Sequence, residues 1–221
     1  LAKNLVLDEV IGITGMLNNN VIYISSLFLP DIPLSKELKK SPNEEYAIFL
    51  SDIHVGSRFF LEEQFKKFIS FLNGEVGNDT YKKIAEKIKY IFFVGDLVDG
   101  VGIYPAQEKE LIITDITEQY VALAKLLAKI PKHMNMIICP GNHDAVRAAE
   151  PQPRLLPEFI AELKDKPNMH FLRNPAWLEI DGLRILMYHG TSADSVIANL
   201  NIKDGYAHPD KVAVELLKRR H

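Results

Sequence analysis

The sequence predicts an α/β fold made of βαβ units, with a central sheet covered on both faces. Three apolar runs, at 46–50, 90–94 and 136–139, have the length and composition of buried strands. Segments with helical spacing separate them, and the longest lies at 114–130. A chain of 221 residues can bury one sizeable core and carry an appendage. Together these observations favour one layered α/β domain.

The beginning of the chain predicts a β-hairpin. Apolar, β-branched runs at 10–17 and 21–29 flank Asn18-Asn19-Asn20, and asparagine tolerates the positive φ of a tight turn. Two strands alone are marginally stable in water. We therefore expect residues 1–30 to be the terminal strands of an upstream β domain.

The polar, proline-containing stretch 31–45 predicts a linker, and the layered domain covers 46–221. After its first three strands this domain continues with short strands and helices. Helices are predicted at 64–72, 155–163, 192–200 and 209–218, and strands at 170–172, 177–180 and 183–188, with a turn at Asp181-Gly182.

Composition narrows the classes of function. The formal net charge of -3 and the pI near 6.2 argue against a broad basic surface, so a nucleic-acid substrate would be held locally, by metals or by a partner. The single cysteine, Cys139, lies in an apolar run and excludes a disulfide framework within the chain. No apolar stretch reaches the roughly 20 residues that span a bilayer. We expect a cytoplasmic protein.

Four polar clusters follow strands and carry the chemistry. A lone Asp-x-His is more often a turn or a helix cap, but all four clusters follow strands, whose carboxyl ends gather ligands in α/β sheets. Oxygen donors and imidazoles suit Mn, Fe or Zn, and two such ions ~3.5–4 Å apart can clamp a phosphate and activate water. The clusters are Asp52-Ile53-His54, Gly95-Asp96-Leu97-Val98-Asp99, Gly141-Asn142-His143-Asp144 and His189-Gly190.

This series resembles the calcineurin-like metallophosphoesterase superfamily. The stretches 51–57 and 95–100 further resemble the small-subunit family of archaeal D-family DNA polymerases. The resemblance implies a layered βαβ sandwich preceded by an OB-fold domain. It also implies a two-metal 3′–5′ proofreading exonuclease, with manganese first among its metals. The implied partners are a large catalytic polymerase subunit and DNA with a single-stranded or frayed 3′ end.

Carried over by position, the resemblance implies a role for each polar residue. His143 would be the general acid, or else a further ligand or a packed histidine, and Asp99 or Asp144 would orient it. The implied metal ligands are Asp52 and His54 for the first ion, Asp96 as the bridge, and Asn142 and His189 for the second.

Residues beside the clusters are candidates for substrate binding. Arg58 and Arg147 could hold phosphates, or be ordinary solvated arginines. Phe59 and Phe60 could stack a frayed base, or pack against the following helix.

One departure from the superfamily concerns the final ligands. No Gly-His-x-His follows His189, so either the domain is incomplete at its carboxyl end, as we expect, or these ligands are absent. A structural polymerase subunit without activity and another metallophosphoesterase are the alternative functions. A protein serine/threonine phosphatase is disfavoured because Gly100, and no nearby arginine, follows Asp99.

Overall fold

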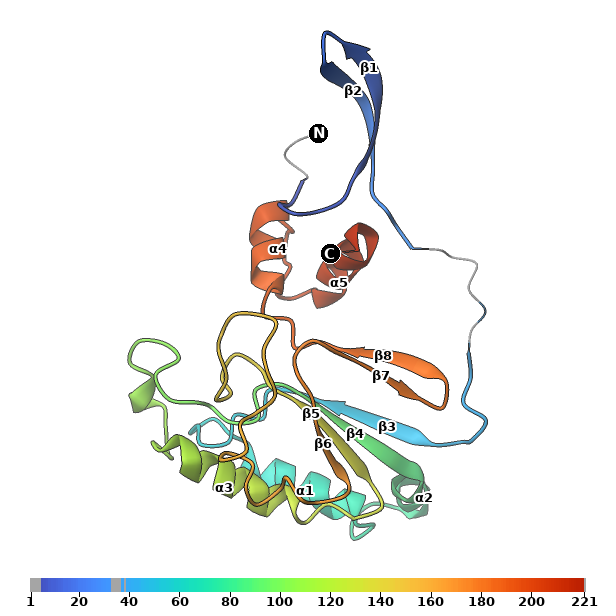
Figure 1. Cartoon of the computed structure of the whole chain (residues 1–221). Helices are drawn as coiled ribbons and strands as arrows, with labels where there is room; N and C mark the ends of the chain where they lie inside the picture. The colour runs from blue at the N-terminus through green and yellow to red at the C-terminus, as the bar shows by residue number, and fades with distance from the viewer. Residues whose placement is uncertain (1–4, 33–36, 38, 221) are drawn as a thin grey trace. The chain divides into compact units, whose positions relative to one another are not determined.

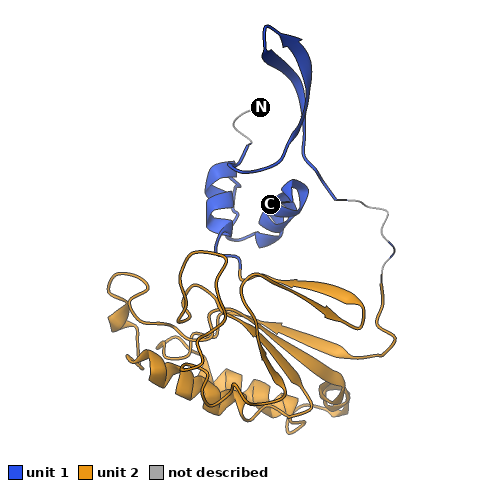
Figure 2. Ribbon diagram, viewed as in Figure 1, with its two compact units in different colours: residues 1–38, 190–221 blue, residues 39–189 orange. Residues whose placement is uncertain are grey.

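The computed structural model describes residues 5–32, 37 and 39–220, and divides into two compact units (Figure 2). One unit combines Leu1–Leu38 with Gly190–His221, and the other is Lys39–His189. Within the described residues, no helix combines the length and apolar character needed to cross a membrane.

The larger unit is built on a four-stranded parallel sheet, in the order β3-β4-β5-β6. Its strands are β3 (Tyr46–Leu50), β4 (Ile88–Val94), β5 (Asn135–Cys139) and β6 (Met169–Phe171). The connections carry α1 (Glu62–Leu72), α2 (Asp79–Lys87), the 3₁₀ turn Gln107–Lys109 and α3 (Ile116–Leu127). Parallel strands and crossover helices confirm the predicted α/β class.

The sheet is covered on both faces by different structures. Figure 1 shows helices along one face and a hairpin over the other, made of β7 (Ala176–Ile180) and β8 (Leu183–Met187). Alternate residues of β4 supply the two cores: Ile91 and Phe93 pack with the helices, and Phe92 packs with Met187 of the hairpin. This period of two is the expected signature of a strand buried on both faces.

The smaller unit contains the predicted amino-terminal hairpin. Strands β1 (Gly12–Asn18) and β2 (Val21–Phe28) pair antiparallel around Asn19 and Asn20, which have φ values of 46° and 62°. The hairpin is therefore confirmed, and its turn uses asparagine as expected. The unit also holds α4 (Ala193–Leu200) and α5 (Pro209–Arg219). The predicted boundaries at 30 and 45, and the OB-fold origin of the hairpin, remain predictions.

The helices of the structure differ from the predicted helices at two places. The segment 155–163 contains turns and no helix, although its apolar residues recur at helical spacing, as in Leu156, Ile160 and Leu163. Pro157 explains the difference, because it lacks an amide donor and restricts the residue before it. Conversely, α2 was not predicted, because it is short and mostly polar; its signal is Asn78, whose side chain accepts from the amide of Tyr81.

Candidate metal centre

The predicted ligand loops meet at the carboxyl edge of the parallel sheet. Asp52 follows β3, the Gly95 loop follows β4, and the Gly141 loop follows β5. Backbone hydrogen bonds continue the ladder into these loops, from the Asp52 amide to the Gly95 carbonyl (3.1 Å) and from the Gly95 amide to the Cys139 carbonyl (3.1 Å). The sheet thus fixes the loops as firmly as its own strands.

Three of the predicted ligands have a left-handed backbone. The φ values are 57° at Asp52, 53° at His54 and 51° at Asp96. Such conformations cost about 1–3 kcal/mol each for residues other than glycine, and they persist where the surrounding structure imposes them, typically at functional sites. Here the imposed turns bring the three side chains together at the sheet edge.

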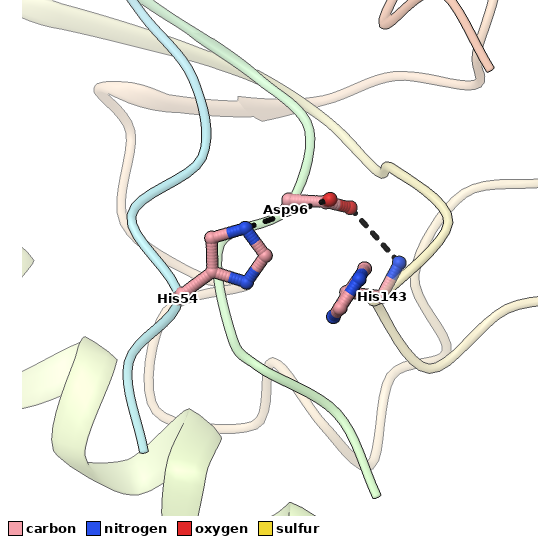
Figure 3. Close-up of side chains that lie close together, drawn as sticks. All are labelled: His54, Asp96 and His143. Atoms are coloured by element: carbon pink, nitrogen blue, oxygen red, sulfur yellow. Dashed lines mark hydrogen bonds and ion pairs between the residues drawn. The ribbon is translucent and has the colours of Figure 1, made fainter. Parts of the chain in front are cut away.

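Asp96 lies at the middle of the cluster. Its carboxylate is buried, 3.8 Å from His54 Nε2 and 3.4 Å from His189 Nε2. Two groups of potential ligands share it: His54, Asp96 and His143 form one, and Asp52, Asp96 and His189 form the other. Figure 3 shows the Asp96 carboxylate facing the ring of His54 and the backbone amide of His143, which donates to Asp96 Oδ1 (2.9 Å). A carboxylate shared in this way has the placement needed to bridge two ions.

Asn142 completes the second group, since its Oδ1 lies 3.1 Å from His189 Nε2. The opposite ring nitrogen, His189 Nδ1, lies 2.8 Å from the Val94 carbonyl. A backbone carbonyl at Nδ1 fixes the tautomer of a metal-binding histidine, and leaves Nε2 free to face an ion.

Two histidines of the cluster have raised pKa values, because the carboxylates beside them favour a positive charge. Burial opposes the protonation of His189, but the carboxylate of Asp96 outweighs it and raises the pKa of His189 to about 9. Hydrogen bonding to Asp52 raises the pKa of His54 in the same way, against a cost of burial. Protons fill the role that a divalent cation would take, and cations compete with protons for such ligands. The donors present therefore fit metal ions.

The two candidate orienting acids are used differently. His143 Nδ1 lies 2.7 Å from the backbone carbonyl of Asp99, whereas the carboxylate of Asp99 lies 3.1 Å from His54 Nδ1, without hydrogen-bond geometry. The buried carboxylate of Asp144 accepts from the Gly141 amide (2.8 Å) and from the Tyr120 hydroxyl (3.0 Å). Asp99 thus contacts both histidines, and Asp144 braces the loop that carries His143.

Buried amides that the motifs do not include hold the loops. Gln152 Nε2 donates to the Gly141 carbonyl (3.0 Å), and Asn174 Oδ1 accepts from the His189 amide (3.0 Å). Asn174 Nδ2 also donates to Gln152 Oε1 (2.8 Å), and Gln107 Nε2 donates to Asp99 Oδ2 (3.0 Å). These partners are far apart in the sequence, so no local pattern could have identified them.

The candidate substrate-binding residues differ from one another in their contacts and exposure. Arg147 donates from its guanidinium to the Pro151 carbonyl of its own loop, while Arg58 is exposed. Phe60 packs against Phe65 of α1, with ring centroids 6.1 Å apart, but Phe59 is 68% exposed. A cavity of about 610 Å³ lies beside the cluster, and its lining includes both phenylalanines, His54 and His143.

Comparison with known proteins agrees with this arrangement. Residues 47–220 match the family model of the calcineurin-like phosphoesterases. The chain is 48% identical over 222 residues to the DNA polymerase II small subunit of Methanocaldococcus jannaschii, covering 100% of this chain and 37% of the relative. It is 46% identical over 221 residues to the protein of the same name from Archaeoglobus fulgidus, covering 100% of this chain and 44% of the relative.

The relative from Methanothermobacter thermautotrophicus carries this name as well, at 39% identity over 222 residues, covering 100% of this chain and 45% of the relative. The chain thus spans less than half the length of these curated relatives. The family match covers all the parallel strands except the first residue of β3, together with every predicted ligand. The chain therefore belongs to the calcineurin-like phosphoesterase family.

Proposed function

We propose that this chain is the phosphoesterase part of the small subunit of an archaeal replicative DNA polymerase, and that it removes nucleotides from the 3′ end of DNA as a proofreading exonuclease. The observation that carries the proposal is the buried carboxylate of Asp96, which two groups of potential ligands share. The names of the relatives support the polymerase context and an association with a larger catalytic subunit.

Each ion has its own set of ligands in this proposal. Asp52 and His54 would hold the first ion, Asn142 and His189 would hold the second, and Asp96 would bind both. The two groups of potential ligands differ from these sets, because they place Asp52 with His189 and His54 with His143. Mixed oxygen and imidazole donors favour manganese over the softer metals, with iron or zinc as the other candidates. When bound, the ions polarise the phosphodiester and lower the pKa of a bound water.

His143 donates the proton to the departing 3′ oxygen. The Asp99 carbonyl, 2.7 Å from Nδ1, keeps a proton on that nitrogen and directs Nε2 away from it. The ring lies beside the cluster, with its centroid 4.6 Å from that of His54. A positioned general acid contributes typically 10²–10⁴-fold to a rate. The alternative, that His143 is a further metal ligand, predicts a loss of bound metal on substitution.

The test is exonuclease activity of the full-length protein on 3′-labelled and 5′-labelled single-stranded DNA with manganese. Asp96→Asn should abolish cleavage, and His143→Ala should reduce it about 10²–10⁴-fold while the manganese content stays unchanged. His133→Ala is the matched control, because His133 is exposed in the loop before β5, at the opposite edge of the sheet.

The possible outcomes separate the candidate functions. Stepwise shortening from the 3′ end, dependent on Asp96, supports the exonuclease. Cleavage that Asp96→Asn leaves unchanged would contradict the two-metal mechanism. Absence of cleavage by a protein that still assembles with the polymerase large subunit would favour a structural subunit. Hydrolysis of small phosphodiesters without cleavage of DNA would indicate a different phosphoesterase.

A further inference from the structure

A hollow outside the metal centre combines exposed aromatic and cationic groups. It has a volume of about 370 Å³, and its lining residues are Arg154, Leu172, Arg173, Pro175, Ala176 and Trp177. Trp177, the one tryptophan of the sequence, is 63% exposed. A large aromatic surface in this position costs solvation free energy unless something covers it.

The arginines around this tryptophan have no carboxylate partners. Among the residues that the structure describes, Arg154, Arg173 and Arg184 form no ion pair. The guanidinium of Arg184 lies over the Trp177 ring, 5.1 Å from the ring centroid. Glu179 is opposite Arg184 in the hairpin register and is the one acidic side chain of that strand. The chain as a whole has a net charge of -3. Three arginines without ion pairs near one tryptophan therefore make this region more positive than the average of the chain.

The buried residues Gln152 and Asn174 link the backbone around this hollow to the metal-binding loops. Arg173 directly precedes Asn174, which accepts from the His189 amide. Arg154 lies two residues after Gln152, which donates to the Gly141 carbonyl. Gln152 and Asn174 also exchange two backbone hydrogen bonds, of 2.7 and 3.1 Å. The same pair of residues therefore fixes both the metal-binding loops and the backbone that carries the two arginines.

We propose that this hollow binds single-stranded DNA next to the metal centre, with a base stacked on Trp177 and phosphates held by Arg154 and Arg173. The inference rests on the proposed function and names how its substrate is held. Stacking on an aromatic ring and charge neutralisation by arginine are the two means by which proteins hold single strands without reading sequence. Together they would hold the DNA locally, on a protein that lacks a broad basic surface.

Binding is measured in EDTA, so that no cleavage occurs, with the full-length protein and a fluorescein-labelled single-stranded oligothymidylate. Trp177→Ala should weaken binding about tenfold, whereas Trp177→Phe should retain most of it. In the double variant Arg154→Gln with Arg173→Gln, the slope of log affinity against log salt should fall by about 1.4, because each phosphate contact on a single strand contributes about 0.7. Glu179→Gln should strengthen binding, since it removes a negative charge from the hairpin.

Two controls make the result specific. Lys132→Gln removes a cation from the loop before β5, at the opposite edge of the sheet, and should leave binding unchanged. Hydrolysis of bis(p-nitrophenyl) phosphate with manganese should be equal in all variants, because none of the substituted residues belongs to the groups of potential metal ligands. If the wild type hydrolyses neither DNA nor bis(p-nitrophenyl) phosphate, but Trp177→Ala still weakens DNA binding, the proposed exonuclease activity is refuted and the proposed binding site is retained.

Three results would overturn the inference. The first is equal affinity of Trp177→Ala and the wild type for the oligonucleotide. The second is a loss with Lys132→Gln that matches the loss with the double arginine variant. The third is that Trp177→Ala weakens association with the polymerase large subunit and leaves DNA binding intact, which would make this face a protein interface.

Discussion

The two sides of Asp96 differ in their access to solvent. On one side, His189 has only 8% of its side chain exposed, and its Nδ1 is held by the Val94 carbonyl. On the other side, the side chain of His54 is 27% exposed. One shared carboxylate thus lies beside an enclosed histidine, His189, and a more open one, His54. Two ions at this centre would therefore not be equivalent: an enclosed ion would lie beside His189, and an open ion would lie beside His54 and the cavity that His54 lines.

Asp96→Asn is expected to have the largest effect, because it is the one substitution that damages both sides. We expect a loss of exonuclease activity of about a thousandfold or more, since bound metals supply several kcal/mol of transition-state stabilisation. Calorimetric titration with manganese should show weaker binding of both ions. Retention of full affinity for either ion would show that the two sides do not share this carboxylate.

Removal of metal should make stability depend on pH through the enclosed side. In the metal-free protein the pKa of His189 is about 9, above the 6.5 of an unperturbed histidine. A raised pKa stabilises the folded state fully below pH 6.5, and this contribution is lost as the pH rises towards 9. The shift corresponds to at most about 3 kcal/mol. Urea unfolding in EDTA should show the loss, and manganese should abolish it by taking the place of the proton.

For this pH dependence, His189→Gln is the informative control, since the variant cannot titrate at this position. Its stability in EDTA should be flat between pH 6.5 and 9, apart from the smaller contribution of His54. A decline as steep as that of the wild type would assign the titration to another group.

Substitution of the amides that hold the loops should have a smaller effect on metal binding. This effect should differ between the His189 side and the His54 side of Asp96. Gln107→Ala frees the Asp99 carboxylate beside His54, and Asn174→Ala frees the His189 amide. Loss of such supporting contacts typically costs 10–100-fold in metal affinity. We expect Gln107→Ala to weaken the open ion alone and Asn174→Ala to weaken the enclosed ion alone. Equal effects of both variants on both ions, measured by manganese titration, would remove the distinction.

Phe59→Ala is expected to have the smallest effect on stability and a clear effect on substrate. Phe59 is exposed on the open side, so its truncation should change the free energy of unfolding by less than about 0.5 kcal/mol. The KM for oligonucleotides should rise if the ring stacks a base. Phe60→Ala is the matched control, because Phe60 packs against Phe65 and its loss should destabilise the fold by about 3 kcal/mol.

The meeting of the loops at the strand ends follows largely from local sequence. The strands β3, β4 and β5 were predictable to within two residues, because each is a short apolar run, although β3 lies at the sheet edge and is partly exposed rather than buried. Motifs immediately after those strands must emerge at one sheet edge, so the meeting of Asp52, Asp96 and Asn142 was also predictable. The family resemblance, which the family model confirms, depended on these same motifs.

The enclosed side could not be derived in this way. Gln152 and Asn174 are 22 residues apart and become partners only after the chain has folded. Nothing in the local sequence distinguishes them from surface amides. The roles of Asp99 and Asp144 were likewise open, because the choice depends on which atoms face His143 in three dimensions. Residues 155–163 form turns although their sequence predicts a helix, because the helical spacing of their apolar residues does not outweigh Pro157.

Anomalous diffraction from manganese-soaked crystals of the full-length protein would show whether the Asp96 carboxylate serves two ions. We expect two anomalous peaks ~3.5–4 Å apart, both within coordination distance of Asp96, with the peak beside His189 at the higher occupancy. A single peak, or two peaks of which only one contacts Asp96, would contradict this expectation.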